Sequence, residues 1–206
     1  SGSYTDNTNQ ETMSTIGPFA FQIGDLTPGT THYYRAKAVG NGMSCGVERS
    51  FTTPTTPPSV VTENATNVTT NSARLEGHLV SPGSASSANV SFEWGVAPGS
   101  YSSETAPQNM KAAGSFNFDV TDLNPGTAYY YRAKAVGDGT SFGDEESLVT
   151  LTTPPSVTTD NATGITATVS ILNGNLASIG TASSANVSFE WGLSLGSYPH
   201  ETAPRP

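Results

Sequence analysis

The chain has 206 residues, enough for one large or two ordinary domains, and a formal net charge of −9 with only eight Lys and Arg residues. Such a balance offers no basic surface for phosphates, so neither nucleic acid nor an anionic membrane is an expected partner. The single cysteine, Cys45, excludes an intrachain disulfide framework, and no apolar run reaches the roughly 20 residues that a membrane span needs. No export signal follows Ser1, so a signal or anchor is expected only outside this sequence.

The composition favours an all-β fold. Thr, Ser, Asn, Val and Tyr are abundant, and 21 Gly and 14 Pro residues recur between short apolar runs. Hydrophobic residues make up 34% of the chain and alternate with polar ones, as in strands that show one face to a core and the other to water.

The sequence repeats itself. The stretch Tyr33 to Gly40 returns unchanged as Tyr130 to Gly137, and Ser86 to Gly95 returns unchanged as Ser183 to Gly192, both at an offset of 97 residues. Proline pairs at 57–58 and 154–155 follow Thr-rich segments and mark the joints between repeats. We therefore predict the C-terminal part of a repeat at 1–54, a complete repeat at 55–153, and the N-terminal part of a further repeat at 154–206.

Alternation of period two predicts six or seven strands in the complete repeat, which suits a β-sandwich. A first strand is expected at Ser59 to Thr62, and Ser91 and Glu93 are expected on the outer face of a later one. The predicted inward rows, in chain order, are Ala73, Leu75, Gly77 and Leu79; Val90, Phe92 and Trp94; Phe116, Phe118 and Val120; Tyr129, Tyr131, Ala133 and Ala135; and Leu148. The flanking parts add Phe189 and Trp191 to the predicted core.

The run Leu123-Asn124-Pro125-Gly126-Thr127-Ala128-Tyr129 resembles the corner between strands E and F of fibronectin type III domains. The resemblance implies tandem fibronectin type III-like sandwiches, with Tyr129 as a corner tyrosine whose hydroxyl bonds to backbone upstream. Leu26 and Pro28 occupy the equivalent corner of the first part, but His32 stands where the tyrosine is expected, which implies a weaker corner. Bacterial and archaeal members commonly form long arrays, which implies an extracellular or cell-surface location.

The phase of the repeats suggests a function. Residues 1–54 carry only later strands and residues 154–206 only early ones, so each part lacks the sheet that its apolar face requires. End-to-end completion by head-to-tail neighbours or adjacent repeats would form a filament or a surface stalk. Two alternatives stay open: a window cut from a longer array, and parts stabilised only by crystal neighbours. Segments 1–12 and 195–206 occupy the same place in the repeat, which counts against simple strand donation.

We expect a structural or adhesive protein, with surface glycans or proteins as further partners. The alternative is a non-catalytic spacer or carbohydrate-binding module of a secreted enzyme. An outward row of Tyr130, Arg132 and Lys134 is a candidate ligand ladder, but Glu93 opposite Arg132 favours an ordinary cross-strand ion pair.

Five asparagines begin an Asn-X-Ser/Thr pattern and are candidate glycosylation sites: Asn64, Asn67, Asn89, Asn161 and Asn186. The pattern also arises by accident in a chain rich in Thr and Asn. Asn89 and Asn186, at equivalent places before a Trp-containing strand, are the preferred candidates.

Nothing in the sequence predicts catalysis, and we expect no enzyme activity, no cofactor and no metal. The histidines His32, His78 and His200 are scattered, and no nucleophile motif or phosphate loop is present. Acidic residues at 138 and 144–146 lack calcium-ligand spacing and are read as a solvated loop. Cys45 falls where Phe142 lies in the next repeat, which predicts a small buried apolar residue.

Overall fold

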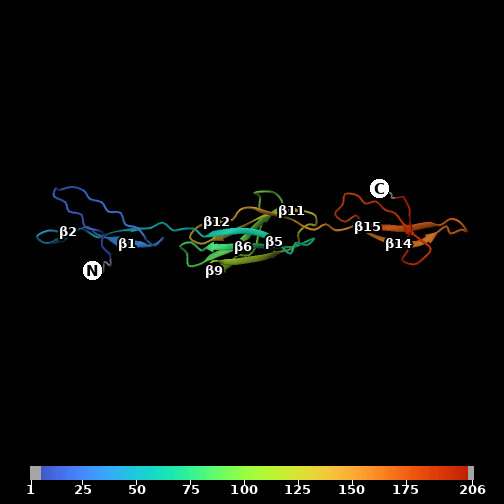
Figure 1. Cartoon of the computed structure of the whole chain (residues 1–206), viewed down its shortest axis with the longest axis horizontal. Coiled ribbons are helices and arrows are strands. Elements are labelled where there is room, and N and C mark those ends of the chain that lie inside the picture. Colours follow the sequence, from blue (N-terminus) through green and yellow to red (C-terminus); the bar gives the residue numbers. More distant parts are fainter. Residues whose placement is uncertain (1–5, 204–206) are drawn as a thin grey trace.

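A computed structural model describes residues 6–203, and all regular elements in this range are β-strands. Three bodies lie in a row along the long axis, with the N-terminus in one outer body and the C-terminus in the other (Figure 1). No helix among these residues has the length and apolar character to cross a membrane. The all-β prediction from composition and alternation is therefore confirmed for the described residues.

The central body is a sandwich of two antiparallel sheets. One sheet has the order β10-β6-β5, with strands Gly114–Val120, Ala73–Ser81 and Ser59–Thr66. Its inward row alternates as the sequence predicts, because Ala73, Leu75 and Leu79 are almost fully buried on the core face of β6.

The second sheet has the order β12-β11-β7-β8, with β13 also paired to β11 and β9 to β7. Its strands are β7 (Ala88–Gly95), β8 (Ser103–Glu104), β9 (Gln108–Met110), β11 (Ala128–Val136), β12 (Thr140–Phe142) and β13 (Glu146–Val149). The central repeat therefore has nine strands instead of six or seven. The last strand is split at Gly143, which passes close to Thr62 of β5, and two short strands pair with the free edge of β7.

The core lies between the two sheets and is centred on Phe92, which is fully buried. The Phe92 ring centroid lies 5.2 Å from that of Phe116, 6.0 Å from Phe118 and 6.2 Å from Tyr131. Burying a side chain of this size stabilises the fold by about 1.5–3 kcal/mol. One outward position differs from expectation: Ser91 lies on the outer face but is only 2% exposed, because its hydroxyl donates to Glu104 on β8.

The two flanking bodies have shorter, separate sheets. Residues 6–54 form β1 (Thr31–Tyr34) paired with β4 (Arg49–Thr52), and β2 (Lys37–Val39) paired with β3 (Met43–Cys45). Residues 154–203 form β14 (Ser156–Thr163) paired with β15 (Ile171–Ser178), and β16 (Glu190–Trp191) paired with β17 (His200–Glu201). Each of these four sheets therefore contains only two strands.

Three predicted burials fail in the flanks. Trp191 is 47% exposed instead of part of a core, and Phe189 is only half-buried. Their equivalents in the central repeat, Trp94 and Phe92, are covered by strands from the later half of the same repeat, which residues 154–203 do not contain. Cys45 is also only half-buried, and its equivalent in the complete repeat, Phe142, is 43% exposed, so this position does not belong to the core even where both sheets are present.

Candidate functional site

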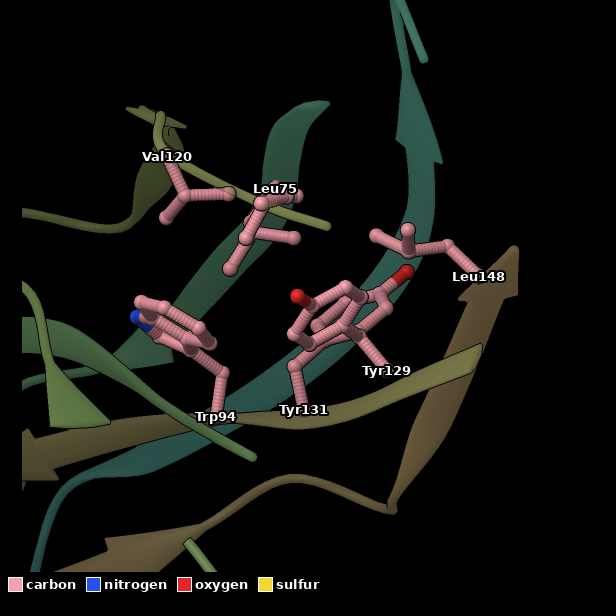
Figure 2. Close-up of a pocket in the computed structure, with 7 residues that line it drawn as sticks. Leu75, Trp94, Val120, Tyr129, Tyr131 and Leu148 are labelled. Carbon is pink, nitrogen blue, oxygen red and sulfur yellow. The ribbon is translucent and has the colours of Figure 1, made fainter. Parts of the chain in front are cut away.

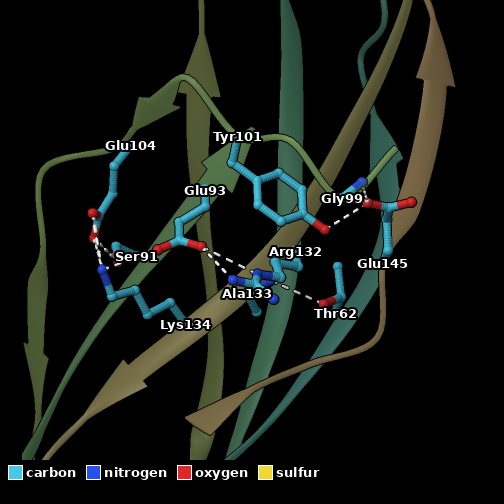
Figure 3. Close-up of polar contacts among 10 residues, drawn as sticks. All are labelled: Thr62, Ser91, Glu93, Gly99, Tyr101, Glu104, Arg132, Ala133, Lys134 and Glu145. Atoms are coloured by element: carbon cyan, nitrogen blue, oxygen red, sulfur yellow. Dashed lines mark hydrogen bonds and ion pairs between the residues drawn. The ribbon is translucent and has the colours of Figure 1, made fainter. Parts of the chain in front are cut away.

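The outer face of the second central sheet carries the densest group of charged side chains among the described residues (Figure 3). Arg132 on β11 lies opposite Glu93 on β7, and its Nη2 lies 2.9 Å from Glu93 Oε2. Lys134 Nζ lies 3.1 Å from Glu93 Oε1 and 3.0 Å from Glu104 Oε2. The predicted cross-strand pair is confirmed, and the lysine extends it into a chain of four charges.

Aromatic rings hold the Arg132 guanidinium in place. Its Cζ lies 4.5 Å from the centroid of the Tyr101 ring and 3.8 Å from that of Phe142. The Tyr101 hydroxyl donates to Glu145 Oε2 at 2.5 Å, and the Gly99 N–H donates to the same oxygen at 2.7 Å (Figure 3). We call these six residues, Glu93, Tyr101, Glu104, Arg132, Lys134 and Glu145, the outer ladder.

The ionisation of the outer ladder follows from these contacts. Burial disfavours the charged form of Glu93, but hydrogen bonds from Arg132 and Lys134 outweigh it and lower the pKa of this carboxyl. Hydrogen bonds to Glu104 and Glu93 raise the pKa of Lys134, and the Tyr101 hydroxyl lowers the pKa of Glu145. Both cations are thus matched by carboxylates of the same sheet, an arrangement that stabilises the sheet and leaves little to recognise an external ligand.

A small apolar gap marks the corner end of the core (Figure 2). Trp94, Tyr129 and Tyr131 surround it together with Leu75, Val120, Leu123 and Leu148. Its volume is about 10 Å³, at the lower limit for one water molecule, and its walls are apolar. The gap is a packing feature between aromatic rings and is too small for an organic ligand.

The corner itself is built on Tyr129. Its hydroxyl accepts a hydrogen bond of 2.8 Å from the Asn124 N–H, and its ring meets Trp94 edge-on at 5.8 Å. Leu123 is buried, and Gly126 has a φ of 61°, which turns the chain after Pro125. Below the corner, burial raises the pKa of Tyr131 to about 12, so its hydroxyl remains the donor to the Glu63 carbonyl at 2.9 Å.

The first flank builds this corner differently. His32 stacks on Phe51 at 5.5 Å, and its Nε2 is buried without a hydrogen-bond partner. Leu26 is half-buried and Pro28 exposed, whereas Leu123 of the central repeat is buried. An imidazole is too short to reach back along the corner as the Tyr129 phenol does.

All five asparagines of the Asn-X-Ser/Thr pattern are exposed. The surroundings of the Ser or Thr two residues later, and the backbone conformation of the asparagine, differ among them. In the Asn89 sequon, Ser91 is buried and its hydroxyl is bonded to Glu104. Asn67 has a φ of 49°, and its equivalent 97 residues on is Gly164 with a φ of 59°. A left-handed turn therefore explains Asn67 without a glycan. Asn64 and Asn161 lie at equivalent exposed places on β5 and β14.

The remaining candidates show no convergent chemistry. No group of three or more His, Cys, Asp or Glu side chains in residues 6–203 could hold a metal ion. Within the acidic loop, Glu145 is bonded to Tyr101 and Gly99, and Asp138 accepts a hydrogen bond from Ser84. His78 contacts Ser115, and His200 stacks on Trp191, so the three histidines lie in separate places.

Sequence reasoning missed the contacts at the joints. The Ser84 N–H donates to the Thr56 carbonyl at 3.0 Å, and 97 residues on the Thr181 N–H donates to the Thr153 carbonyl at 3.0 Å. Gly83 and Gly180, with φ of 74° and 66°, lie against the same carbonyls, and a Cβ on either would overlap them. Most glycines of the chain recur at this offset, so the recurrence of Gly83 as Gly180 does not by itself identify the joint in the sequence.

The other side of each linker is also held. The Gly29 N–H donates to the Pro54 carbonyl at 3.1 Å, and the equivalent Gly126 N–H donates to the Leu151 carbonyl at 3.1 Å. Each linker is therefore bound to the corner of the preceding repeat and to a loop of the following one. The two joints therefore share two backbone hydrogen bonds at equivalent positions.

No family model matches the sequence, and no relative is found among curated proteins. Solved structures with a similar fold include the sensor domain of the anti-sigma factor RsgI4 in Pseudobacteroides cellulosolvens, with 19% identity, a TM-score of 0.36, and coverage of 46% of this chain and 95% of that one. The FN1-FN3 domains of chicken CNTN1 show 15% identity and a TM-score of 0.35 over 62% of this chain and 45% of that one.

Domains d3-d4 of the rat CD45 extracellular region are also similar, with 17% identity and a TM-score of 0.39 over 70% of this chain and 76% of that one. The all-β architecture itself follows from the strands of the described residues.

Proposed function

We propose that this chain is a non-catalytic structural protein of the cell exterior, in which fibronectin type III-like repeats act as stiff spacers of a stalk or filament. The observation that carries the proposal is the recurrence of one joint at 56/83–84 and again at 153/180–181. Repeats joined by the same hydrogen bonds keep the same relative orientation, so their lengths add along one direction.

The geometry of the sandwich supports a spacer. The longest strands, β6 and β11, have nine residues each, which corresponds to about 30 Å along the chain axis. Chain entry and exit lie at opposite ends of the central body (Figure 1). Each added repeat therefore extends the molecule by roughly one strand length plus a linker.

The outer ladder supports the same function over a ligand-binding one. Arg132 and Lys134, the cations that would contact a glycan or an acidic partner, are engaged by Glu93 and Glu104. A binding site of this kind would need polar groups directed toward solvent and a concave surface.

Small-angle X-ray scattering of the full chain tests the spacer. We expect an elongated particle whose distance distribution broadens in Gly83→Ala and Ser84→Ala, since the first places a Cβ against the Thr56 carbonyl and the second removes a hydroxyl that accepts from the Thr56 N–H at 3.0 Å. Gly99→Ala is the matched control, because Gly99 has a φ of 67° but no atom within 4 Å of a Cβ. Joint variants that scatter like the wild type would contradict a stiff joint.

The exterior location has its own test. Antibody labelling or protease treatment of intact cells that express the native protein should reach the repeats, and Asn64 and Asn161, exposed at equivalent places, should be the first asparagines to carry any glycan. Repeats protected until the cells are lysed would overturn the location while leaving the spacer intact.

A further inference from the structure

The central sandwich has four outer strand edges, and they are not equally protected. The two sheets end at β5 and β10, and at β8 with β9 and β12 with β13. An open strand edge carries unpaired N–H and C=O groups and can pair with another chain, so natural sheets block their edges with short strands, bulges, prolines or a covering segment. Three of the four edges have such protection, and the edge of β10 does not.

The edge of β5 is covered by the second sheet. Thr62 Oγ1 accepts a hydrogen bond of 2.9 Å from the Ala133 N–H, and the Tyr131 hydroxyl donates to the Glu63 carbonyl at 2.9 Å. The pairing of β5 with β6 also shifts register between Glu63 and Thr66. A further strand therefore has no access to this edge while the two sheets stay together.

The edges of the second sheet consist of short strands. β8 and β9 have two and three residues, and Pro107, which has no N–H, lies directly before β9. β12 and β13 have three and four residues and are separated at Gly143. Neither edge presents a long, uninterrupted row of main-chain groups.

β10 is a long and regular edge strand. Its seven residues, Gly114 to Val120, pair with β6 in one unbroken register, and no strand among residues 6–203 pairs with its other edge. This stretch contains no proline and no lysine. Its outward side chains Ser115, Asn117 and Asp119 are all exposed. The central repeat thus keeps one edge open.

The first flank has a proline at the same place of the repeat. Gly114 to Val120 corresponds to Gly17 to Ile23 at the offset of 97 residues, and Pro18 stands at the place of Ser115. Proline within a strand is confined to its first residue, to bulges, or to edge positions whose N–H points to solvent. Ser115 is neither the first residue of β10 nor at a bulge, so its main-chain groups point away from β6. By the alternation of an antiparallel ladder, those of residues 117 and 119 do the same.

The open edge is complementary to a second copy of itself. In an antiparallel pair about a two-fold axis at Asn117, the two Asn117 residues face each other, and Ser115 of each copy faces Asp119 of the other. Each facing pair can exchange two main-chain hydrogen bonds, because all three residues point outward. Asp119 meets no second carboxylate, and Arg74 of its own copy holds it with Nε 2.7 Å from Oδ1. The pairing therefore brings no unmatched charge into the contact.

The core face of β10 also favours the pairing. Phe118 is only half-buried, whereas Phe116, two residues away on the same face, is 3% exposed. The two-fold pair sets Phe116 of one copy beside Phe118 of the other. Apolar surface that water reaches in the single chain is then buried, which favours association.

We propose that β10 of one copy of this chain pairs antiparallel with β10 of a second copy, about a two-fold axis at Asn117, and joins their first sheets into one continuous sheet. β5 and β6 lie along the long axis of the molecule (Figure 1), and β10 belongs to the same sheet, so the two molecules lie side by side. They run in opposite directions, as two stalks from facing surfaces do. Only this last step rests on the proposed function; the pairing itself does not require it.

Sedimentation velocity of the full chain over a hundredfold range of concentration tests the pairing. We expect a reversible equilibrium that stops at the dimer, because an isologous contact leaves neither β10 edge free. Ser115→Pro, which introduces the residue of the first flank, should raise the dissociation constant at least tenfold, since it removes an N–H donor from each copy. Asn117→Lys places two like charges opposite each other and should do the same. Val80→Lys, at an exposed outward position of β6, is the control and should associate like the wild type.

Disulfide cross-linking tests the register. In a Cys45→Ser background, which removes the free cysteine, Asn117→Cys should form an intermolecular disulfide with glutathione disulfide as the oxidant. Facing Cα atoms of a hydrogen-bonded pair lie about 5.5 Å apart, within the range of a disulfide. Ser115→Cys should not form one, because the equivalent residue of the second copy lies four residues along the strand, about 13 Å away.

A wild type that stays monomeric overturns the pairing, and so does association that neither Ser115→Pro nor Asn117→Lys weakens. A disulfide that forms as readily in Ser115→Cys as in Asn117→Cys overturns the two-fold register. Near-ultraviolet circular dichroism checks the fold of each variant, and Asn117→Lys, whose side chain points to solvent, decides alone if the proline unfolds the repeat. The spacer is read separately from the scattering of the monomer: an elongated monomer that does not associate would reject the pairing and retain the spacer.

Discussion

Identical sequences adopt different structures in the central repeat and in the flanks. Ser86 to Gly95 and Ser183 to Gly192 are the same ten letters, yet the first contains the eight-residue strand β7 and the second only the two-residue strand β16. Tyr130 to Val136 lies within one continuous strand, β11, but its copy at Tyr33 to Val39 is broken into β1 and β2. Strand formation here depends on the partner strand and the opposite sheet more than on local sequence.

The largest expected effect comes from a substitution at the centre of the core of the central repeat. Phe92→Ala should lower the free energy of unfolding of the central repeat by about 3–5 kcal/mol, because the side chain is fully buried among other rings. Phe189→Ala, the same substitution in the same sequence, should cost about 1 kcal/mol or less, since this ring is only half-buried. Urea unfolding measures both, and equal losses would mean that the flank has a core of its own.

A second test exchanges the corners. Tyr129→His gives the central repeat the residue of the first flank and should cost about 1–3 kcal/mol, because the Asn124 N–H loses its acceptor. The reverse exchange, His32→Tyr, should leave unfolding of the central repeat unchanged. Thermal denaturation followed by near-ultraviolet circular dichroism reports the corner directly, and an unaltered Tyr129→His variant would show that the hydroxyl contributes nothing.

A smaller effect separates two tyrosines that lie in identical sequences. Tyr131→Phe should cost about 1 kcal/mol, because its buried hydroxyl donates to the Glu63 carbonyl. Tyr34→Phe should have no measurable effect on stability, since Tyr34 is 49% exposed. Chemical denaturation of both variants is sufficient, and a cost at Tyr34 would indicate that its hydroxyl is bonded in solution.

The smallest effect concerns pH. The folded state lowers the pKa of Glu93, so the ion pairs with Arg132 and Lys134 contribute stability above the ordinary carboxyl pKa of 4.5 and lose it as the pH falls through the lower, folded value. Glu93→Gln should therefore flatten the acid limb of stability against pH between 4.5 and the folded pKa. Glu190→Gln, its counterpart in the last flank, is the control; a wild-type acid limb in Glu93→Gln would contradict the assignment.

The sequence predicted the features that depend on alternation and on the repeat. The inward rows of β6 and β11 and the Arg132–Glu93 pair follow directly from a period of two and from an antiparallel register. Features that depend on where a loop returns were not predictable. The burial of Ser91 requires β8 to lie against β7, and the break before β13 requires Gly143 to meet β5.

The candidate site was predicted only in part for the same reason. The register places Arg132 beside Glu93. Tyr101 and Phe142 reach the guanidinium, and Glu145 reaches the Tyr101 hydroxyl, from loops or a short edge strand whose course no periodicity describes. The exposure of Trp191 was mispredicted because a pattern of residues shows which face is apolar but not whether another sheet covers it.

The placement of β5 and β13 on different sheets determines how the central repeat responds to tension. A pull on the chain enters at β5 and leaves at β13, and β5 lies along the long axis of the molecule (Figure 1). The load on the β5–β6 ladder then acts parallel to the strands, so its hydrogen bonds are sheared together instead of being opened one after another. A stalk built from such units would yield in abrupt steps under force, one repeat at a time.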